Sequence, residues 1–464
     1  MSPQRATMAR PWAQFDPLAS DEGGRLWLLF TGALALLLFG YALFDRAFAW
    51  IHVPSTPLFA GEVVLALGIA AFIAAAQRPS LLTGPSRPLR WLVLYMGWGL
   101  AVLVVGVGTF SIDALRDSAI WYYGMFAILI ASSALVRPLE WWVERYALAI
   151  PFILLWLPFA VVLGALWGQS GPTVPDGLVS VFSHNTPNIA IHAALALGFL
   201  WTIGFRFNRL RRWRIPLSIL CFTLIIVVAV VSRTAILAVA VGGLVLFLGM
   251  PERRHRLVWL SVGFIVVVGS AAFLLRVEIS LFDNNRDISP AQLAENVISI
   301  LAPDRLTTEE QGENLVSNRE WRTGFWGQVA DDVTRDRPLA GFGFGPNLRE
   351  RYDLQDEEVP ARSVHSSHVN VLARMGWVGA LLWLGLWSSW FHALGRTRTR
   401  LVADGLETAA GLALILMMGA AMFLVNGVFN EVAEGPQGAI WLWSIFGLGV
   451  VLDLAANSRV RQPT

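Results

Sequence analysis

The chain has 464 residues, of which 55% are hydrophobic and only 15% are charged, and its formal net charge is +2. A soluble domain carries about a quarter charged residues, so this composition excludes a set of ordinary water-soluble domains. The single cysteine, Cys221, excludes an intrachain disulfide.

Long apolar runs recur along nearly the whole chain. A helix that crosses the ~30 Å hydrocarbon core needs about 20 apolar residues, and the runs predict an all-α integral membrane protein with about twelve transmembrane helices. Their expected bounds are 25–44, 57–77, 91–109, 117–136, 146–167, 187–205, 215–231, 234–250, 257–275, 368–394, 405–428 and 438–455. A single helix from Ile215 to Met250 would be about 54 Å long. The polar break at Ser232-Arg233-Thr234 therefore predicts a hairpin of two helices.

The positions of the arginines predict the orientation of these helices, because the sequence contains no lysine. Every second connection is basic, as are both ends of the chain, and the connections between them are poor in arginine. The basic connections and ends contain Arg78, Arg87 and Arg90; Arg137 and Arg145; Arg206, Arg209, Arg211, Arg212 and Arg214; Arg253, Arg254 and Arg256; Arg396, Arg398 and Arg400; Arg5, Arg10 and Arg25; and Arg459 and Arg461. Basic connections stay in the cytoplasm. We therefore expect a protein of the bacterial inner membrane with both termini in the cytoplasm and a cytoplasmic tail at 1–24.

One connection is far longer than the others. Residues 276–367, between the helices expected at 25–275 and those expected at 368–464, carry 17 acidic residues and 10 arginines. A loop of this length and charge is usually functional and exposed to water. Because basic and arginine-poor connections alternate along the chain, this loop is expected on the periplasmic side. The spacing of Trp321, Phe325 and Val329 predicts a helix over 319–333 with one apolar face. We expect a large periplasmic loop made of short helices.

Several motifs follow one another in and around this loop. They are Asn185-Thr-Pro187-Asn188, Ser232-Arg233-Thr234, Arg322-Thr-Gly-Phe-Trp326, Arg337-Pro-Leu-Ala-Gly-Phe-Gly-Phe-Gly345, His365-Ser-Ser-His368-Val-Asn-Val-Leu372 and Gly376-Trp-Val-Gly379. Their order and spacing resemble the O-antigen ligase/polymerase family. The resemblance covers roughly residues 180–380 in detail and the whole chain in topology.

The resemblance implies a reaction. Its members transfer a glycan from an undecaprenyl diphosphate carrier to an acceptor hydroxyl, on lipid A-core or on a growing polysaccharide, in lipopolysaccharide or exopolysaccharide biosynthesis. The transfer needs cations that hold the diphosphate and a base that accepts the hydroxyl proton. Arginine suits the first task and histidine the second. No metal or cofactor is implied.

The resemblance also implies which residues act. Counting back from Gly376 and Gly379 aligns His365 with the family's active histidine, although the family often has asparagine where this chain has Ser366. His368 therefore remains an alternative base. The expected diphosphate-binding residues are Arg233, Arg322, Arg319 and Arg116, and the expected substrate contact is Asn188.

Each of these residues has a simpler interpretation. His365 and His368 share a helix face and could bind a metal with Glu357 or Glu358, or could be structural. Arg233 could extend to the membrane rim, Asp113 and Asp117 could neutralise Arg116, and one of Arg319 and Arg322 could pair with Glu320, Asp331 or Asp332. The run of Gly341, Gly343 and Gly345 follows no strand and precedes Pro346, so it predicts a turn and not a nucleotide site. His184 and His192 are expected to be structural.

Two other classes of protein compete with the enzyme. A lipid-glycan flippase or another transporter would carry ionisable residues or broken helices near mid-membrane, and the predicted spans are nearly free of central charges. A scaffold subunit of a polysaccharide complex would not need the histidine and arginine motifs. The sequence does not choose between a ligase and a polymerase.

Overall fold

The computed structural model describes residues 22–54, 56, 58–74, 86–134, 136–167, 170–175, 179–250, 296, 309–352 and 362–460. Within these ranges every named element is a helix, and β-structure is confined to two isolated bridges. The elements are α2 (Glu22–Ala49), α3 (Ala60–Ala74), α4 (Arg87–Phe110), α5 (Ile112–Asp117), α6 (Ala119–Tyr122), α7 (Met125–Ser133), α8 (Leu139–Trp167), α9 (Thr186–Thr202), η3 (Gly204–Arg206), α10 (Asn208–Val231), α11 (Arg233–Gly249), α14 (Glu309–Asp336), α15 (Leu348–Arg351), α16 (Ser367–Ala403), α17 (Glu407–Phe429) and α18 (Pro436–Val460).

Seven of the described helices are long and apolar enough to cross a membrane: α2, α4, α8, α10, α16, α17 and α18. The shorter helices α3 and α11 are also apolar. The protein is therefore a multi-pass membrane protein, but the predicted count of twelve spans is not confirmed. The predicted span 257–275 lies outside the described residues, as do 276–295, 297–308 and 353–361 of the predicted loop, and with the last of these Glu357 and Glu358.

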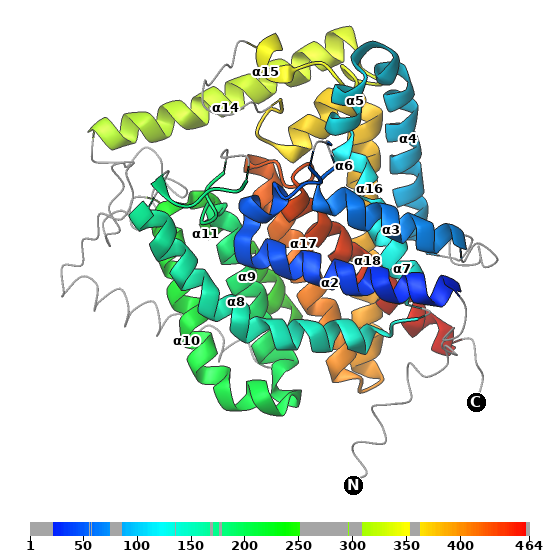
Figure 1. Ribbon diagram of the computed structural model, residues 1–464, viewed down its shortest axis with the longest axis vertical. Helices are drawn as coiled ribbons and strands as arrows, with labels where there is room; N and C mark the ends of the chain where they lie inside the picture. Colours follow the sequence, from blue (N-terminus) through cyan, green and yellow to red (C-terminus); the bar gives the residue numbers. More distant parts are fainter. Residues whose placement is uncertain are drawn as a thin grey trace.

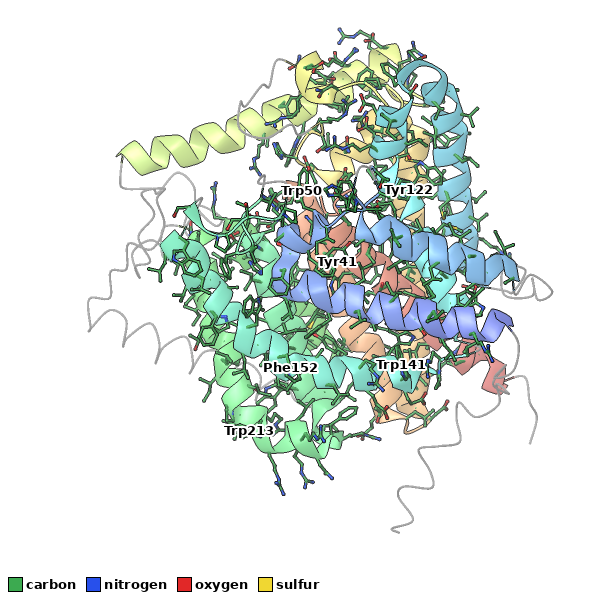
Figure 2. The ribbon with its side chains drawn as sticks, viewed as in Figure 1. Tyr41, Trp50, Tyr122, Trp141, Phe152 and Trp213 are labelled. Carbon is green, nitrogen blue, oxygen red and sulfur yellow. The ribbon has the colours of Figure 1, made fainter. Side chains whose placement is uncertain are left out.

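The outer helices expose apolar side chains in the way expected of a lipid-facing surface. Phe152 on α8, which is labelled in Figure 2, is 64% exposed. Trp213, near the start of α10, is 63% exposed. α17 and α18 are the interior helices, with 61% and 83% of their most apolar windows buried. The bundle thus buries its C-terminal helices and shields them from lipid.

The predicted hairpin at Ser232 is confirmed. α10 ends at Val231 and α11 begins at Arg233, and the Ser232 side chain caps α11 by accepting a hydrogen bond from the Ala235 amide at 3.3 Å. A serine N-cap satisfies one of the backbone amides that a helix start leaves unpaired. The polar break therefore ends one helix and begins the next.

The predicted continuous span 117–136 is wrong, because this stretch is divided into the short helices α6 and α7, which follow the end of α5 at Asp117. Its polar groups are held by contacts from elsewhere in the fold. Tyr122 and Tyr123 both donate hydrogen bonds to Glu62 at the start of α3, at 3.1 and 2.5 Å. Asp117 accepts from Arg374 in α16 at 2.8 Å. These tertiary bonds override the apolar pattern that predicted one helix.

The helix predicted at 319–333 is confirmed and is longer, because α14 runs from Glu309 to Asp336. Figure 1 shows α14 (yellow-green) along the upper left of the molecule, whereas α10 (green) begins at the bottom. Phe325, Val329 and Val333 are buried against Leu348, Val364 and Ala373. The apolar face of α14 thus docks this amphipathic helix on α15 and the start of α16.

The glycine motif at 341–345 forms a turn, as predicted, and this turn packs closely against a kink in α16. Gly341 and Gly376 have φ angles of 63° and 64°, which glycine adopts readily and other residues rarely do. A Cβ on Gly341 would lie 2.4 Å from the Ala373 carbonyl oxygen, and one on Gly376 would lie 2.3 Å from the Leu339 carbonyl oxygen. The two backbones approach so closely that neither position accommodates a side chain.

Candidate functional site

Several helix ends meet at one end of the bundle, beneath α14. α11 packs antiparallel to α17, since Gly249 lies against Leu414 and Gly242 against Met422. This register brings the start of α11 level with the end of α17. The starts of α9 and α16 lie there too, because Asn426 and Asn430, in and just after the last turn of α17, contact the first residues of both helices. We call this region the α17 end.

His365 lies at the α17 end, one residue before the cap of α16. Its Nδ1 is 3.5 Å from Oε1 of Glu431, and the two side chains are 41% and 34% exposed. The same Glu431 oxygen accepts a hydrogen bond from the Ser363 hydroxyl. His365 has a φ of 53°, in the left-handed region that histidine seldom occupies. A carboxylate that is itself held by a hydroxyl thus faces one nitrogen of an accessible imidazole.

His368 has a different environment, since both of its ring nitrogens are engaged. The Trp383 indole donates to Nδ1 at 3.0 Å, so Nε2 carries the proton and donates to the Leu424 carbonyl at 2.9 Å. The ring joins α16 to α17 and fits the structural interpretation.

Arg322 extends from α14 to the α17 end. Its Nη1 donates to the Phe429 carbonyl at a long 3.5 Å, two residues before Glu431. Burial lowers the pKa of its guanidinium, which still remains charged at neutral pH. Arg319 lies one turn earlier on α14, and three residues of separation put both arginines on one face of the helix. The side chain of Arg319 lies outside the description.

Arg233 and Asn188 also lie at the α17 end. Arg233 is the first residue of α11 and is half-buried. Asn188, in the first turn of α9, is 5% exposed and donates to Asp45 at 3.0 Å while accepting from Asn426 at 3.0 Å. Asn430 continues this chain by donating to Asn426 at 2.7 Å. The predicted substrate contact is thus part of a buried polar network below the exposed histidine.

Sequence reasoning missed two acidic residues in the connection between α17 and α18. Glu431 faces His365, and Glu434 accepts from the Ser367 hydroxyl at 2.9 Å and from the Asn370 amide. Burial, and next the nearby Glu431 charge, raise the pKa of Glu434 to about 7. The signal that could have identified both was a pair of carboxylates in a short connection between two apolar helices.

A second arginine cluster, also missed, surrounds Asp117. Arg374 is 1% exposed and contacts Asp117 at 2.8 Å, and Arg362 contacts Asp117 at 3.3 Å and Asp113 at 3.2 Å. The two aspartates expected to neutralise Arg116 therefore pair with these arginines, and Arg116 is exposed on α5. We call Arg362, Arg374, Asp113 and Asp117 the turn cluster, because it also bonds the glycine turn.

The turn cluster fixes residues 343–346 through their backbone. Arg374 Nη1 donates to the Pro346 carbonyl at 2.8 Å and the Gly343 carbonyl at 3.4 Å, and the Gly345 amide donates to Asp117 at 3.0 Å. Arg362 donates to the Gly345 carbonyl. Among the described residues, no group of three or more histidine, cysteine, aspartate or glutamate side chains is arranged to hold a metal ion.

The protein-family comparison agrees with the motifs. The model described as O-antigen ligase matches residues 217–384, which run from α10 through α14 and the glycine turn to the middle of α16. This segment is therefore similar to the O-antigen ligase family. It contributes Arg233, Arg322, His365 and the turn cluster's two arginines, whereas Glu431 and Asn188 lie outside the matched residues. No curated protein matches the chain.

Proposed function

We propose that the protein transfers a glycan from undecaprenyl diphosphate to an acceptor hydroxyl at the periplasmic face of the bacterial inner membrane. The similarity to the O-antigen ligase family indicates a glycan ligase or polymerase with lipid-linked glycan substrates in general. The finer proposal concerns the donor, the acceptor on lipid A-core or a growing polysaccharide, and the residues that act.

His365 is the proposed base. Its contact with Glu431 favours a proton on Nδ1, which leaves Nε2 with a lone pair for the acceptor hydroxyl. As that oxygen forms a bond to the anomeric carbon, the bond from the anomeric carbon to the diphosphate oxygen breaks. The hydroxyl proton goes to Nε2, and the bond electrons leave with undecaprenyl diphosphate. The Glu431 carboxylate stabilises the imidazolium that results.

Arg322 and Arg233 are the proposed diphosphate ligands, with Arg319 and Arg116 as further candidates. A guanidinium presents several N–H donors that match phosphate oxygens. The starts of α9, α11 and α16 meet at the α17 end, and the positive ends of their helix dipoles add to the attraction for an anion. We propose that Asn188 holds the α17 end in place through its hydrogen bond with Asn426. Because arginines supply the positive charge that binds the diphosphate, we expect the purified protein to keep its activity in EDTA. A specific requirement for Mg²⁺ would refute the proposal that arginines alone bind the diphosphate.

One observation carries the proposal: the exposed His365 faces Glu431 at 3.5 Å, and Arg322 reaches Phe429 on the same short segment. This juxtaposition provides a base, its orienting carboxylate and a phosphate-binding cation. Neither a flippase nor a scaffold subunit needs a base beside a cation.

The experiment is a gene deletion followed by analysis of the cell's glycolipids, with complementation by wild type, His365→Ala and His368→Ala. Loss of long chains from lipid A-core with accumulation of carrier-linked polymer would identify a ligase. Single repeat units on the core would identify an O-antigen polymerase, and loss of a secreted polysaccharide with normal core would identify an exopolysaccharide polymerase. Accumulation of the carrier-linked glycan on the cytoplasmic face would instead indicate a flippase and refute the proposal.

The proposed orientation, with both termini in the cytoplasm, rests on the arginine pattern. It is tested by replacing Gly324, which is exposed on α14, with cysteine in a Cys221→Ser background. Labelling by a membrane-impermeant thiol reagent in intact spheroplasts is expected. Labelling only after lysis would invert the topology.

A further inference from the structure

A basic cavity lies between α4, α16 and α18, away from the α17 end. Its volume is about 610 Å³, within the size range of small-molecule sites. It is lined by Arg87 at the start of α4, by His392, Arg396 and Arg400 of α16, and by Asp453 and Asn457 of α18. Three arginines face one aspartate, so the lining carries a net positive charge.

The polar floor of this cavity is already hydrogen-bonded within the protein. Asp453 accepts from Thr397 at 2.5 Å and from Asn457 at 3.1 Å, and Arg400 donates to Asn457 at 2.7 Å. No ion pair between described residues engages Arg87, Arg396 or Arg400. The aspartate is therefore held by neutral donors, and the arginine charge is available to an anion.

The wall of the cavity leads into an apolar surface. Trp91 packs on Gly385, where an added Cβ would lie 2.5 Å from the indole ring. Leu94 on α4 and Leu381 on α16 lie one helical turn beyond Trp91 and Gly385, on the side away from the arginines, and they are 57% and 63% exposed. α4 and α16 run antiparallel here, because Trp98 bonds the Met375 carbonyl at 2.9 Å. Arginines, a tryptophan and exposed leucines thus follow one another along both helices.

This order matches the depth profile of a lipid bilayer. Tryptophan concentrates at the level of the headgroups, and exposed leucine faces the acyl chains. Basic cavities between membrane helices hold anionic headgroups. The cavity also lies with the basic connections, since Arg398 of α16 bonds the Gly249 carbonyl at the end of α11. That side of the bundle is the one that the arginine pattern assigns to the cytoplasm.

We propose that this cavity is a binding site for an anionic glycerophospholipid. The headgroup phosphate contacts Arg87 and Arg396, and an acyl chain lies over Leu94 and Leu381. The occupant is a lipid and not a soluble phosphate compound, because the apolar surface continues directly from the basic one. The site is independent of the transfer chemistry proposed at the α17 end.

The test measures phosphatidylglycerol binding to the purified full-length protein in detergent, by native mass spectrometry and by the lipid-dependent shift in melting temperature. We expect saturable binding of phosphatidylglycerol, and no comparable shift with phosphatidylcholine. The Arg87→Gln/Arg396→Gln variant should bind about 10- to 30-fold more weakly, since each arginine near an anionic surface contributes a few-fold in affinity. Arg211→Gln/Arg212→Gln, which removes two exposed arginines at the start of α10, is the matched control and should bind normally.

Three results would overturn the proposal. Equal weakening in the control variant would mean diffuse attraction to basic residues. An equal shift with sn-glycerol 3-phosphate would mean a soluble phosphate ligand. Ala393→Phe fills the cavity and keeps every charge, so unchanged phosphatidylglycerol affinity in that variant would place the lipid elsewhere. This last variant decides the matter even where removal of the arginines impairs folding.

Discussion

The turn cluster and the α17 end both use arginine, and they use it in opposite ways. Arg374 is 1% exposed, contacts Asp117 and donates to two carbonyls of the glycine turn. Arg322 is half-buried and donates from Nη1 to one backbone carbonyl at 3.5 Å. A buried arginine that pairs with a carboxylate and donates to backbone carbonyls holds a fold together, whereas an arginine beside an accessible histidine suits an anionic ligand. The partners of an arginine distinguish these roles, and its place in a motif does not.

The sharpest test of the α17 end removes the proposed base. We expect His365→Ala to lower turnover about 10²- to 10⁴-fold and to leave donor binding and melting temperature nearly unchanged, because the side chain is 41% exposed. Transfer by reconstituted protein measures the first and lipid-carrier binding the second. His368→Ala should chiefly lower the melting temperature, since it breaks a hydrogen bond from α16 to Leu424 of α17 and a second one to Trp383 within α16. A stable His368→Ala protein without activity, beside an active His365→Ala protein, would reverse the assignment.

A substitution in the turn cluster should lower the stability of the fold. Arg374→Met leaves Asp117 with one arginine partner and removes the bonds to the turn, and breaking a buried ion pair costs about 3–5 kcal/mol. We expect a large loss of folded protein, measured by thermal unfolding in detergent. Arg322→Met is the matched control on the other arginine and should change the free energy of unfolding far less. Equal destabilisation by the two variants would remove the distinction between the clusters.

Arg322 itself should affect both binding and turnover. A hydrogen bond to a charged group contributes about 1.5–3 kcal/mol, so Arg322→Ala should weaken donor binding by about 10- to 150-fold. Arg322→Lys should recover part of the loss, because an ammonium keeps the charge without the guanidinium fork. Donor titration of both variants measures this. Full recovery with lysine would argue against a bidentate phosphate contact.

The smallest expected effect is a pH dependence from Glu434. Burial raises the pKa of this carboxyl from 4.5 to about 7, so the folded protein holds a proton that the unfolded chain releases between these values. Its contribution to stability is present at low pH and is lost as pH rises through about 7. We expect the melting temperature to fall as the pH rises from about 4.5 to about 7, and to fall less in Glu434→Gln. An identical pH profile in the variant would exclude Glu434 as the source.

The sequence predicted the local features of the fold well. Apolar runs and the polar break at Ser232-Arg233-Thr234 predicted the α10–α11 hairpin, and the spacing of Phe325 and Val329 predicted the buried face of α14. It failed at 117–136, where Tyr122 and Asp117 bond residues far away in the sequence. Periodicity reports which face of an element is apolar, and it carries no information on such distant partners.

The motifs contain several residues that lie together at the α17 end, but the sequence does not predict how they pair. His365, Arg322 and Arg233 lie at the same end of the bundle as expected. The sequence preferred His365 only by its spacing to Gly376 and Gly379, whereas in the structure the Trp383 and Leu424 contacts engage both ring nitrogens of His368. The sequence did not predict a role for Glu431, because this residue comes 66 residues after His365 and lies outside the recognisable motifs. Pairing across that distance depends on the packing of α17 against α16.

The kink at Gly376 divides α16 into two segments that can move separately. The helix has 37 residues, about 55 Å of length, which exceeds the ~30 Å hydrocarbon core. A helix longer than the bilayer is thick responds to hydrophobic mismatch by tilting. Because the glycine turn clamps the backbone at Gly376, we expect such tilt to be confined to residues 377–403 and the segment that follows His365 to stay in place. Transfer rates should therefore vary little between bilayers of short-chain and long-chain lipids. A steep dependence on bilayer thickness would show that the two halves of the helix move together.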